Sequence, residues 1–143
     1  WLEEPLLADD LEGHRRLGEL ALIPIAGGEH EYTRWGYQDL LASQALTVWQ
    51  PDACWVGGMT TMREIFALGQ ANGIWVVPHR GSEVWGLHAI LALADRPLAE
   101  GGRPWVTWVN GAPPIVDGMV AAPTAPGFGV TFDESLLVRP ARA

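Results

Sequence analysis

The stretch GIWVVPHRGSEVWGLHAILALAD, residues 73–95, joins the pattern of a short buried strand to that of a helix. Residues 74–77 form a continuous apolar run that ends at a proline, as strands commonly do. Apolar residues then recur at helical spacing over residues 82–95. The stretch therefore predicts one strand–helix unit, with His79 and Arg80 in the loop that joins the two.

The same unit recurs before this stretch, so that strand-like runs alternate with helical patterns along the chain. The runs are continuously apolar rather than alternating, which indicates a parallel sheet buried on both faces and an α/β fold class. Two architectures fit: an open doubly wound sheet, or part of a (β/α) barrel, of which this chain would supply around half because a barrel needs about 250 residues. The predicted strands cover residues 1–4, 23–26, 46–50 and 74–77, and the predicted helices cover residues 9–22, 33–43, 61–72 and 82–95.

Polar residues mark the expected N-terminal starts of two of these helices. Asp9 or Asp10 can cap the first helix, and Thr61 with Glu64 has the spacing of a capping box for the third. His14 lies among charged residues of the first helix, so we expect it to face solvent.

Length, composition and charge exclude several classes of protein. The chain has 143 residues with 48% apolar and 18% charged residues, which suits one globular domain. Its net charge of −8 disfavours binding to nucleic acid or to anionic membranes. The single Cys54 excludes an intrachain disulfide framework, so a reducing, cytoplasmic setting is the default expectation. No apolar run approaches the roughly 20 residues that span a bilayer, so we expect neither a nucleic-acid nor a membrane partner.

Polar side chains follow the predicted strands at regular intervals. They are Glu3, Glu29, Asp52, His79 and Glu100, separated by 26, 23, 27 and 21 residues, or one strand–helix unit each time. Since parallel strands end at one edge of the sheet, and barrel active sites lie at that face, we expect the five side chains to cluster there.

This set of side chains divides into two chemical groups. Glu3 and Glu29 offer the carboxylate oxygens that Mg²⁺ prefers. Asp52 and His79 lie on the next two strands, where a carboxylate bonded to one imidazole nitrogen orients the ring and raises its basicity. A base beside a metal ion that polarises a carboxylate can remove a proton α to that carboxylate.

The sequence resembles the enolase superfamily, and within it the branch of mandelate racemase and muconate lactonizing enzyme. The resemblance covers essentially the whole chain and is closest to rhamnonate dehydratases and related acid-sugar dehydratases. It implies the C-terminal portion of a (β/α)₇β TIM-like barrel, with residues 1–112 in the barrel and residues 113–143 as a Pro/Gly-rich extension of the same domain. The motifs that carry it are WLEEP (1–5), GGEHEYTRWG (27–36), QPDACWVGGMTT (50–61), VVPHRGSEVW (76–85) and PGFGV (126–130).

The resemblance implies a role for each strand-end residue. Glu3 and Glu29 match the second and third magnesium ligands of the family, and Asp52 and His79 match its catalytic dyad. Glu100 matches the carboxylate of the last barrel strand, which usually contacts the substrate. The family's first metal ligand and its capping domain have no counterpart in this chain. We therefore expect a fragment whose N-terminal portion is missing and which is inactive alone.

Three further residues near the expected site carry open alternatives. Glu3 and Glu4 are adjacent, so one of them points inward; the spacing favours Glu3 and leaves Glu4 for a structural salt bridge. His30 either bonds a substrate hydroxyl or packs in its loop. Arg80 stands where these dehydratases usually have a glycine. A one-residue insertion here would alter specificity. The Arg80 side chain either binds a substrate carboxylate or phosphate or forms a surface salt bridge.

The resemblance implies an activity for the full-length protein. It would be a lyase that dehydrates a rhamnonate-like acid sugar to a 2-keto-3-deoxy acid, with Mg²⁺ stabilising the enediolate formed when His79 removes the α-proton. A racemase, epimerase or cycloisomerase of the same superfamily is the alternative, and a truncated, non-catalytic barrel fragment is another. The expected partner is a small acid sugar, and the full-length protein is expected to be a cytoplasmic homo-oligomer.

Overall fold

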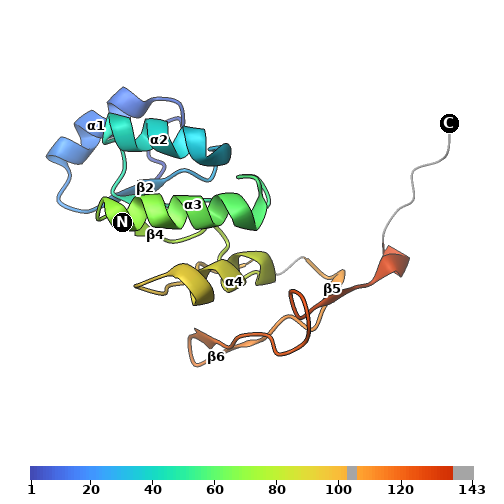
Figure 1. The fold of residues 1–143 in the computed structure, drawn as a ribbon. Helices are drawn as coiled ribbons and strands as arrows, with labels where there is room; N and C mark the ends of the chain where they lie inside the picture. Colours follow the sequence, from blue (N-terminus) through green and yellow to red (C-terminus); the bar gives the residue numbers. More distant parts are fainter. Residues whose placement is uncertain (103–105, 137–143) are drawn as a thin grey trace.

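The computed structural model describes residues 1–102 and 106–136. Its centre is a four-stranded parallel sheet in the order β1-β2-β3-β4, and each strand is followed by a helix (Figure 1). The strand–helix alternation predicted from the sequence is therefore confirmed. The strands are β1 (Leu2–Glu3), β2 (Ile25–Gly27), β3 (Val48–Trp49) and β4 (Trp75–Val76), and the helices are α1 (Leu11–Leu20), α2 (Thr33–Ser43), α3 (Gly58–Ala71) and α4 (Val84–Leu93).

The helix starts agree with the sequence in part. The side chain of Asp10 caps α1 by accepting a hydrogen bond from the backbone N–H of Gly13 at 2.9 Å, as expected. The capping box predicted at Thr61 is wrong, because α3 begins three residues earlier. Gly57 and Gly58 have φ values of 111° and 80°, a backbone conformation that glycine adopts without strain, so the turn rather than a side chain starts this helix.

The exposure predicted for His14 is also wrong. His14 is 2% exposed, and its Nδ1 lies 3.0 Å from the carbonyl oxygen of Asp10. It shares the helix face of Leu11 and Leu17, which lie three residues to either side and pack against the core. The inward face of α1 is therefore set by these positions, and the charged neighbours of His14 point elsewhere.

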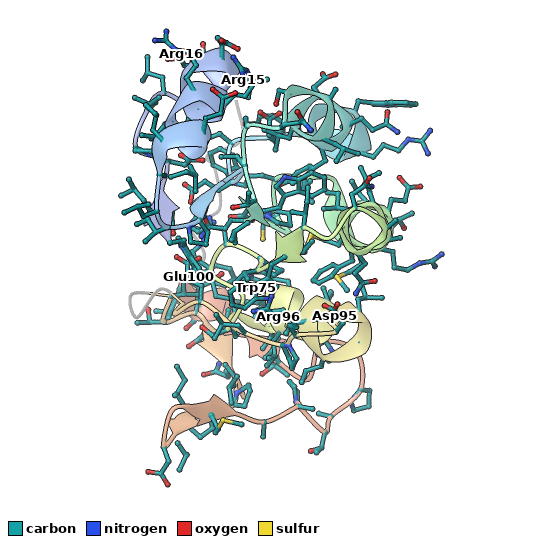
Figure 2. The ribbon with its side chains drawn as sticks, turned by 90° about the vertical axis from the view of Figure 1, so that its left-hand side faces the viewer. Arg15, Arg16, Trp75, Asp95, Arg96 and Glu100 are labelled. Carbon is teal, nitrogen blue, oxygen red and sulfur yellow. The ribbon has the colours of Figure 1, made fainter. Side chains whose placement is uncertain are left out.

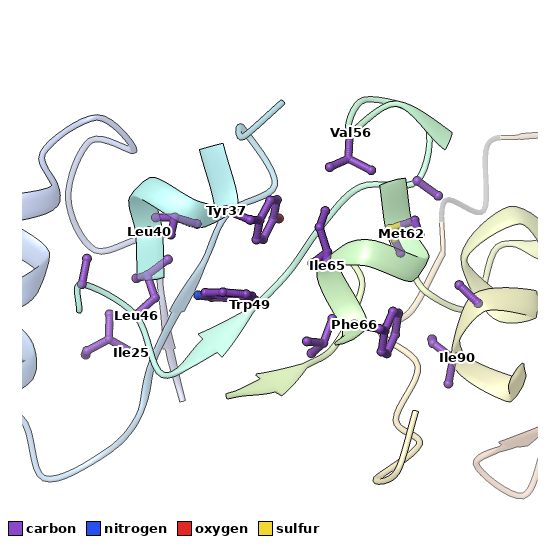
Figure 3. Close-up of a cluster of buried hydrophobic side chains, with 14 residues drawn as sticks. Ile25, Tyr37, Leu40, Leu46, Trp49, Val56, Met62, Ile65, Phe66 and Ile90 are labelled. Atoms are coloured by element: carbon purple, nitrogen blue, oxygen red, sulfur yellow. The ribbon is translucent and has the colours of Figure 1, made fainter. Parts of the chain in front are cut away.

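The main core lies between the sheet and its helices (Figure 3). Trp49 of β3 packs edge-on against Tyr37 of α2, with 5.2 Å between ring centroids. Met62 and Phe66 of α3 are buried in the same cluster. Burying aromatic and aliphatic side chains of this size stabilises each by about 1.5–3 kcal/mol, so the helices are fixed firmly on this face of the sheet.

The opposite face of the sheet is also apolar, but smaller side chains line it. Ala26, Val48 and Val77 form a second buried cluster, with Trp75 packed against it. Because side chains alternate along a strand, the two clusters belong to the two faces of one sheet. The Trp1 and Trp75 ring centroids lie 5.6 Å apart although β1 and β4 are the outer strands, which indicates a strongly curved sheet.

The rest of the described chain lies beyond α4 (Figure 1). It contains an antiparallel pair, β5 (Val109–Asn110) with β8 (Thr131–Phe132), and a hairpin of β6 (Ile115–Val116) with β7 (Met119–Val120), before the 3-10 turn Glu134–Leu136. Trp108 stacks on Trp85 of α4 at 6.4 Å between centroids, which joins this part to the barrel helices. The division into residues 1–112 and 113–143 stays a prediction.

The segment after α4 is tied to the sheet at β4. Figure 2 shows Arg96 beside Trp75, whose Nε1 donates a hydrogen bond to the Arg96 carbonyl at 3.0 Å, while the guanidinium carbon lies 4.3 Å from the ring centroid. Arg15 and Arg16 of α1 lie at the top of the same view. Within the described ranges, each helix is too short or too polar to cross a bilayer.

Candidate active site

His79 and Asp52 meet at the carboxyl ends of β4 and β3. His79 Nδ1 lies 3.2 Å from Asp52 Oδ2, and the backbone N–H of Cys54 donates to Oδ1 at 2.8 Å. Asp52 is 3% exposed. Burial by itself would raise the pKa of Asp52, but hydrogen bonds from His79, the Cys54 amide and Arg80 outweigh it and hold the pKa at about 2. This carboxylate therefore stays ionised beside the imidazole.

The second nitrogen of His79 faces another carboxylate. Nε2 lies 3.0 Å from Glu29 Oε2, so Asp52 and Glu29 lie on opposite sides of the ring. The hydrogen bond with Asp52 is the main cause that raises the pKa of His79; Glu29 adds to it, while burial opposes it. Burial raises the pKa of Glu29, and repulsion from Glu4 and Glu3 adds to that shift. The site thus holds a basic histidine next to a crowded group of acids.

Arg80 and Glu100 complete the dyad side of the site. An Arg80 guanidinium nitrogen contacts Asp52 Oδ2, the same oxygen that His79 approaches. The backbone N–H of Arg80 donates to Glu100 Oε2 at 2.6 Å. Glu100 follows α4 as predicted, but the described residues around it form no strand. Its backbone carbonyl accepts from Ser82, and this bond places it beside the loop of the base.

Glu3 and Glu4 lie in different environments. Glu3 Oε2 accepts hydrogen bonds from Gln50 Nε2 at 2.8 Å and from Trp1 Nε1 at 3.1 Å. Glu4 Oε1 accepts from the Gly28 backbone at 3.2 Å, and its Oε2 lies 2.9 Å from His30 Nδ1, the structural contact expected for this residue.

The structure differs here from the metal pair named from the sequence. Within the described ranges, the ligand atoms that lie within 4.8 Å of one another belong to Glu4, Glu29 and His30, not to Glu3. The difference follows from the backbone at Glu4, which lies directly after β1 and has a φ of 37°, so its side chain turns away from that of Glu3. Glu3 pairs in register with Ala26, which belongs to the second buried cluster. The Glu4 side chain instead packs against Gly27, so closely that a Cβ added to Gly27 would lie 3.0 Å from it. Glu3 is therefore on the face of the sheet opposite the helices, with Gln50.

Two further residues contribute to the site, and of these only Gln50 was not singled out from the sequence. Gln50 is 1% exposed and donates a hydrogen bond to the Glu3 carboxylate. The sequence signal for this role is a polar residue at the end of an apolar strand, directly before Pro51. Trp55, 48% exposed, stands edge-on to His30 at 6.1 Å and stacks on Tyr32 at 6.0 Å between centroids. The Trp55 ring therefore lies next to His30, which contacts the Glu4 carboxylate.

Residues 1–136 match the family described as enolase C-terminal domain-like. The chain belongs to this family. The curved parallel sheet with helices on its outer face, and polar side chains at the carboxyl ends of its strands, agrees with that membership. The fold predicted from the sequence, the C-terminal portion of an enolase-superfamily barrel, is confirmed.

Relatives within the enolase superfamily have several activities. The chain is 36% identical over 153 residues to the L-rhamnonate dehydratase of Saccharopolyspora erythraea, covering 97% of this chain and 38% of that protein. It is 34% identical over 140 residues to the 3,6-anhydro-alpha-L-galactonate cycloisomerase of Streptomyces coelicolor, with coverages of 97% and 38%. The chain thus spans under two fifths of the length of these relatives.

A solved structure of the superfamily contains both a metal and a sugar acid. L-talarate dehydratase from Polaromonas sp. JS666, complexed with Mg and L-glucarate, is 33% identical and superimposes with a TM-score of 0.82, over 94% of this chain and 37% of that one. The side chains of this chain suit the same kind of ion. Carboxylate oxygens of Glu3, Glu4 and Glu29 lie at one edge of the sheet. Burial, with a smaller contribution from repulsion by Glu4 and Glu3, raises the pKa of Glu29, and a divalent cation would offset both effects.

Proposed function

We propose that the protein is a magnesium-dependent acid-sugar dehydratase, a lyase that converts a rhamnonate-like aldonate to a 2-keto-3-deoxy acid. The observation that carries the proposal is the position of His79, with Nδ1 toward buried Asp52 and Nε2 toward Glu29. A histidine that is oriented by one carboxylate and faces a second, cation-binding carboxylate would have the geometry of a base for a proton α to a carboxylate. The relatives named as dehydratases support the substrate class.

The chain's own residues divide the work of the reaction. Glu29, which faces His79, would hold Mg²⁺ together with Glu3, because the Glu4 carboxylate is already bonded to His30 and the Gly28 amide. The ion would supply positive charge next to the substrate carboxylate and lower the cost of removing the α-proton. In the neutral imidazole, Asp52 Oδ2 would accept the Nδ1–H of His79, so that Nε2, which lies 3.0 Å from Glu29, is the nitrogen that takes the proton.

Proton removal and elimination then follow at His79. Nε2 takes the proton from the α-carbon, and the electrons of that C–H bond end in a double bond to the β-carbon. The bond from the β-carbon to its hydroxyl breaks, and His79 returns its proton to the departing oxygen as water. The resulting enol becomes the 2-keto-3-deoxy acid by moving a proton from oxygen to carbon. Glu100, whose Oε2 accepts a hydrogen bond from the Arg80 backbone, would contact the substrate.

A cycloisomerase is the second candidate, because the Streptomyces coelicolor relative carries that name at 34% identity. Both reactions begin with removal of a proton α to a carboxylate, so the residues of this site suit either. They differ in the product, since dehydration of an aldonate loses one water and cycloisomerisation loses none. Mass spectrometry of the product therefore separates the two.

The proposal is tested on the product of the complete gene, because the named activities belong to relatives of which this chain covers 38%. A panel of acid sugars with Mg²⁺ is assayed for 2-keto-3-deoxy acid, with wild type, His79→Asn and the control His88→Asn. His88 lies on α4 and contacts Phe128, away from the dyad. We expect His79→Asn to lower kcat by about 10²–10⁴-fold, the usual contribution of a general base, and His88→Asn to keep it. Retained turnover in His79→Asn would overturn the assignment of the base.

A further inference from the structure

Arg80 makes two contacts that connect separate parts of the proposed active site. Its guanidinium reaches the Asp52 carboxylate, and its backbone N–H donates to Glu100 at 2.6 Å. Asp52 comes from the end of β3, whereas Glu100 comes from the segment after α4. One residue in the loop after His79 therefore holds carboxylates from two other strand–helix units.

The contact with Asp52 shares an atom with the dyad. Oδ2 of Asp52 accepts from both His79 and Arg80, while Oδ1 accepts from the Cys54 amide. Three donors from two segments fix the position and plane of this buried carboxylate. A buried anion also needs a compensating cation, and an arginine supplies one permanently, because it does not lose its proton in proteins. Asp52 keeps that cation when the imidazole is neutral.

The backbone at Arg80 supports a specific role for the side chain. Its φ is 51°, in the left-handed region, which favours glycine and which other residues enter at some cost. The position nevertheless carries a long side chain that is 18% exposed and turned toward Asp52. Its Nε is buried and finds no hydrogen-bond partner among residues 1–102 and 106–136. The guanidinium is thus engaged inside the site rather than spread over the surface.

We propose that Arg80 is a positioning residue, which holds Asp52 through its guanidinium and Glu100 through its backbone so that the base loop keeps one geometry. This proposal rests on the proposed function and deepens it. It differs from a role of Arg80 in binding the substrate, because the guanidinium acts on Asp52 and reaches the substrate only through His79.

The test uses the complete gene product with three variants. Arg80→Met removes the guanidinium, Arg80→Lys keeps the charge without the planar fork, and Arg34→Met is the matched control on α2, where Arg34 contacts exposed Glu64. We expect Arg80→Met to lower kcat by about 10²-fold, the cost of a misplaced catalytic group, with KM nearly unchanged. Arg80→Lys should recover part of the loss, and Arg34→Met should match wild type.

Two kinetic results would overturn the proposal. A KM raised about tenfold or more in Arg80→Met with kcat preserved would assign the guanidinium to substrate binding. Unchanged kcat and KM would leave Arg80 without a part in the reaction. If Arg80→Met does not fold, Arg80→Lys decides between these outcomes, because the lysine keeps a cation at the site but cannot hold Oδ2 with the same geometry.

A structural readout separates this proposal from the proposed function. If the wild type dehydrates no acid sugar, the proposed function fails, and Arg80 is judged by NMR of protein with ¹⁵N-labelled histidine. We expect the Nδ1–H signal of His79 in wild type and Arg34→Met, and its loss in Arg80→Met as Asp52 moves. The same signal in Arg80→Met as in wild type would show that Asp52 is held without Arg80 and would overturn the proposal.

Discussion

The two halves of the candidate site are built differently. In the dyad half, Asp52 is nearly fully buried and each of its oxygens has a donor. In the carboxylate half, Glu3 is exposed, and Glu4 and Glu29 face each other and His30 from partly exposed positions. The pKa of Asp52 is lowered, whereas the pKa of Glu29 is raised.

The opposite pKa shifts indicate how far the chain itself stabilises the carboxylate charge in each half. The Asp52 carboxylate already has cationic and N–H partners within the chain, so the dyad half is complete as it stands. The Glu29 carboxylate is close to other acids and gains most from an added positive charge. The strands of this chain therefore preform the base, whereas the carboxylate half is arranged for a cation.

The largest expected effect comes from removing the central carboxylate of the cation half. Glu29→Gln should weaken binding of Mg²⁺ or Mn²⁺ to the complete gene product by about 10²-fold or more. Even mutation of residues that only hydrogen-bond to a metal ligand lowers metal affinity by about 10–100-fold. Isothermal titration of Mn²⁺ measures it. Glu64→Gln on the exposed face of α3 is the control, and an unchanged affinity in Glu29→Gln would show that the cation binds elsewhere.

The next effect tests the dyad half through its pH dependence. Because the folded pKa of Asp52 is lowered from 3.8 to about 2, its contribution to stability is present above pH 3.8 and is lost as the pH falls through about 2. The loss amounts to about 2 kcal/mol. Urea unfolding of wild type and Asp52→Asn between pH 5 and 2 should show the steeper fall in wild type.

The control for this measurement is Asp117→Asn, which lies in the exposed turn between β6 and β7 and tolerates the same substitution. It should follow the wild-type pH dependence. Parallel curves for wild type and Asp52→Asn would mean that Asp52 has no favourable partners in the folded protein.

The smallest effect distinguishes the two adjacent glutamates of β1. Glu3 lies with Gln50 on the face of the sheet opposite the helices, whereas Glu4 is occupied by His30 and Gly28. We expect Glu3→Gln to weaken Mn²⁺ binding about tenfold and Glu4→Gln to change it by less. The reverse order in the same titration would make Glu4 the ligand, in line with its position near Glu29 and His30.

Much of the fold could be predicted from the sequence. Continuous apolar runs specify buried parallel strands, and Asp10 marks the start of α1. The burial of His14 could not be foreseen, because its sequence neighbours are charged. Its position is set instead by the packing of the α1 face that carries Leu11 and Leu17. The start of α3 was missed because two glycines with positive φ open it, and backbone conformation outweighed the side-chain pattern.

The site was predictable where spacing along the chain decides position. The repeat of about 25 residues brings Glu29, Asp52 and His79 to one edge of the sheet. It does not determine where side chains turn after the strands end. The contact of Arg80 with Asp52 and that of Glu4 with His30 both depend on residues with positive φ, which sequence patterns do not reveal.

The most direct test of the two-part site is a crystal structure of the complete gene product grown with Mn²⁺, using the anomalous signal of the metal. We predict a peak at the Glu29 carboxylate with Glu3 beside it, and the same contacts of Asp52 with His79 and Arg80 as in the present structure. A peak away from Glu29, or a dyad that forms only when the metal is bound, would contradict this prediction.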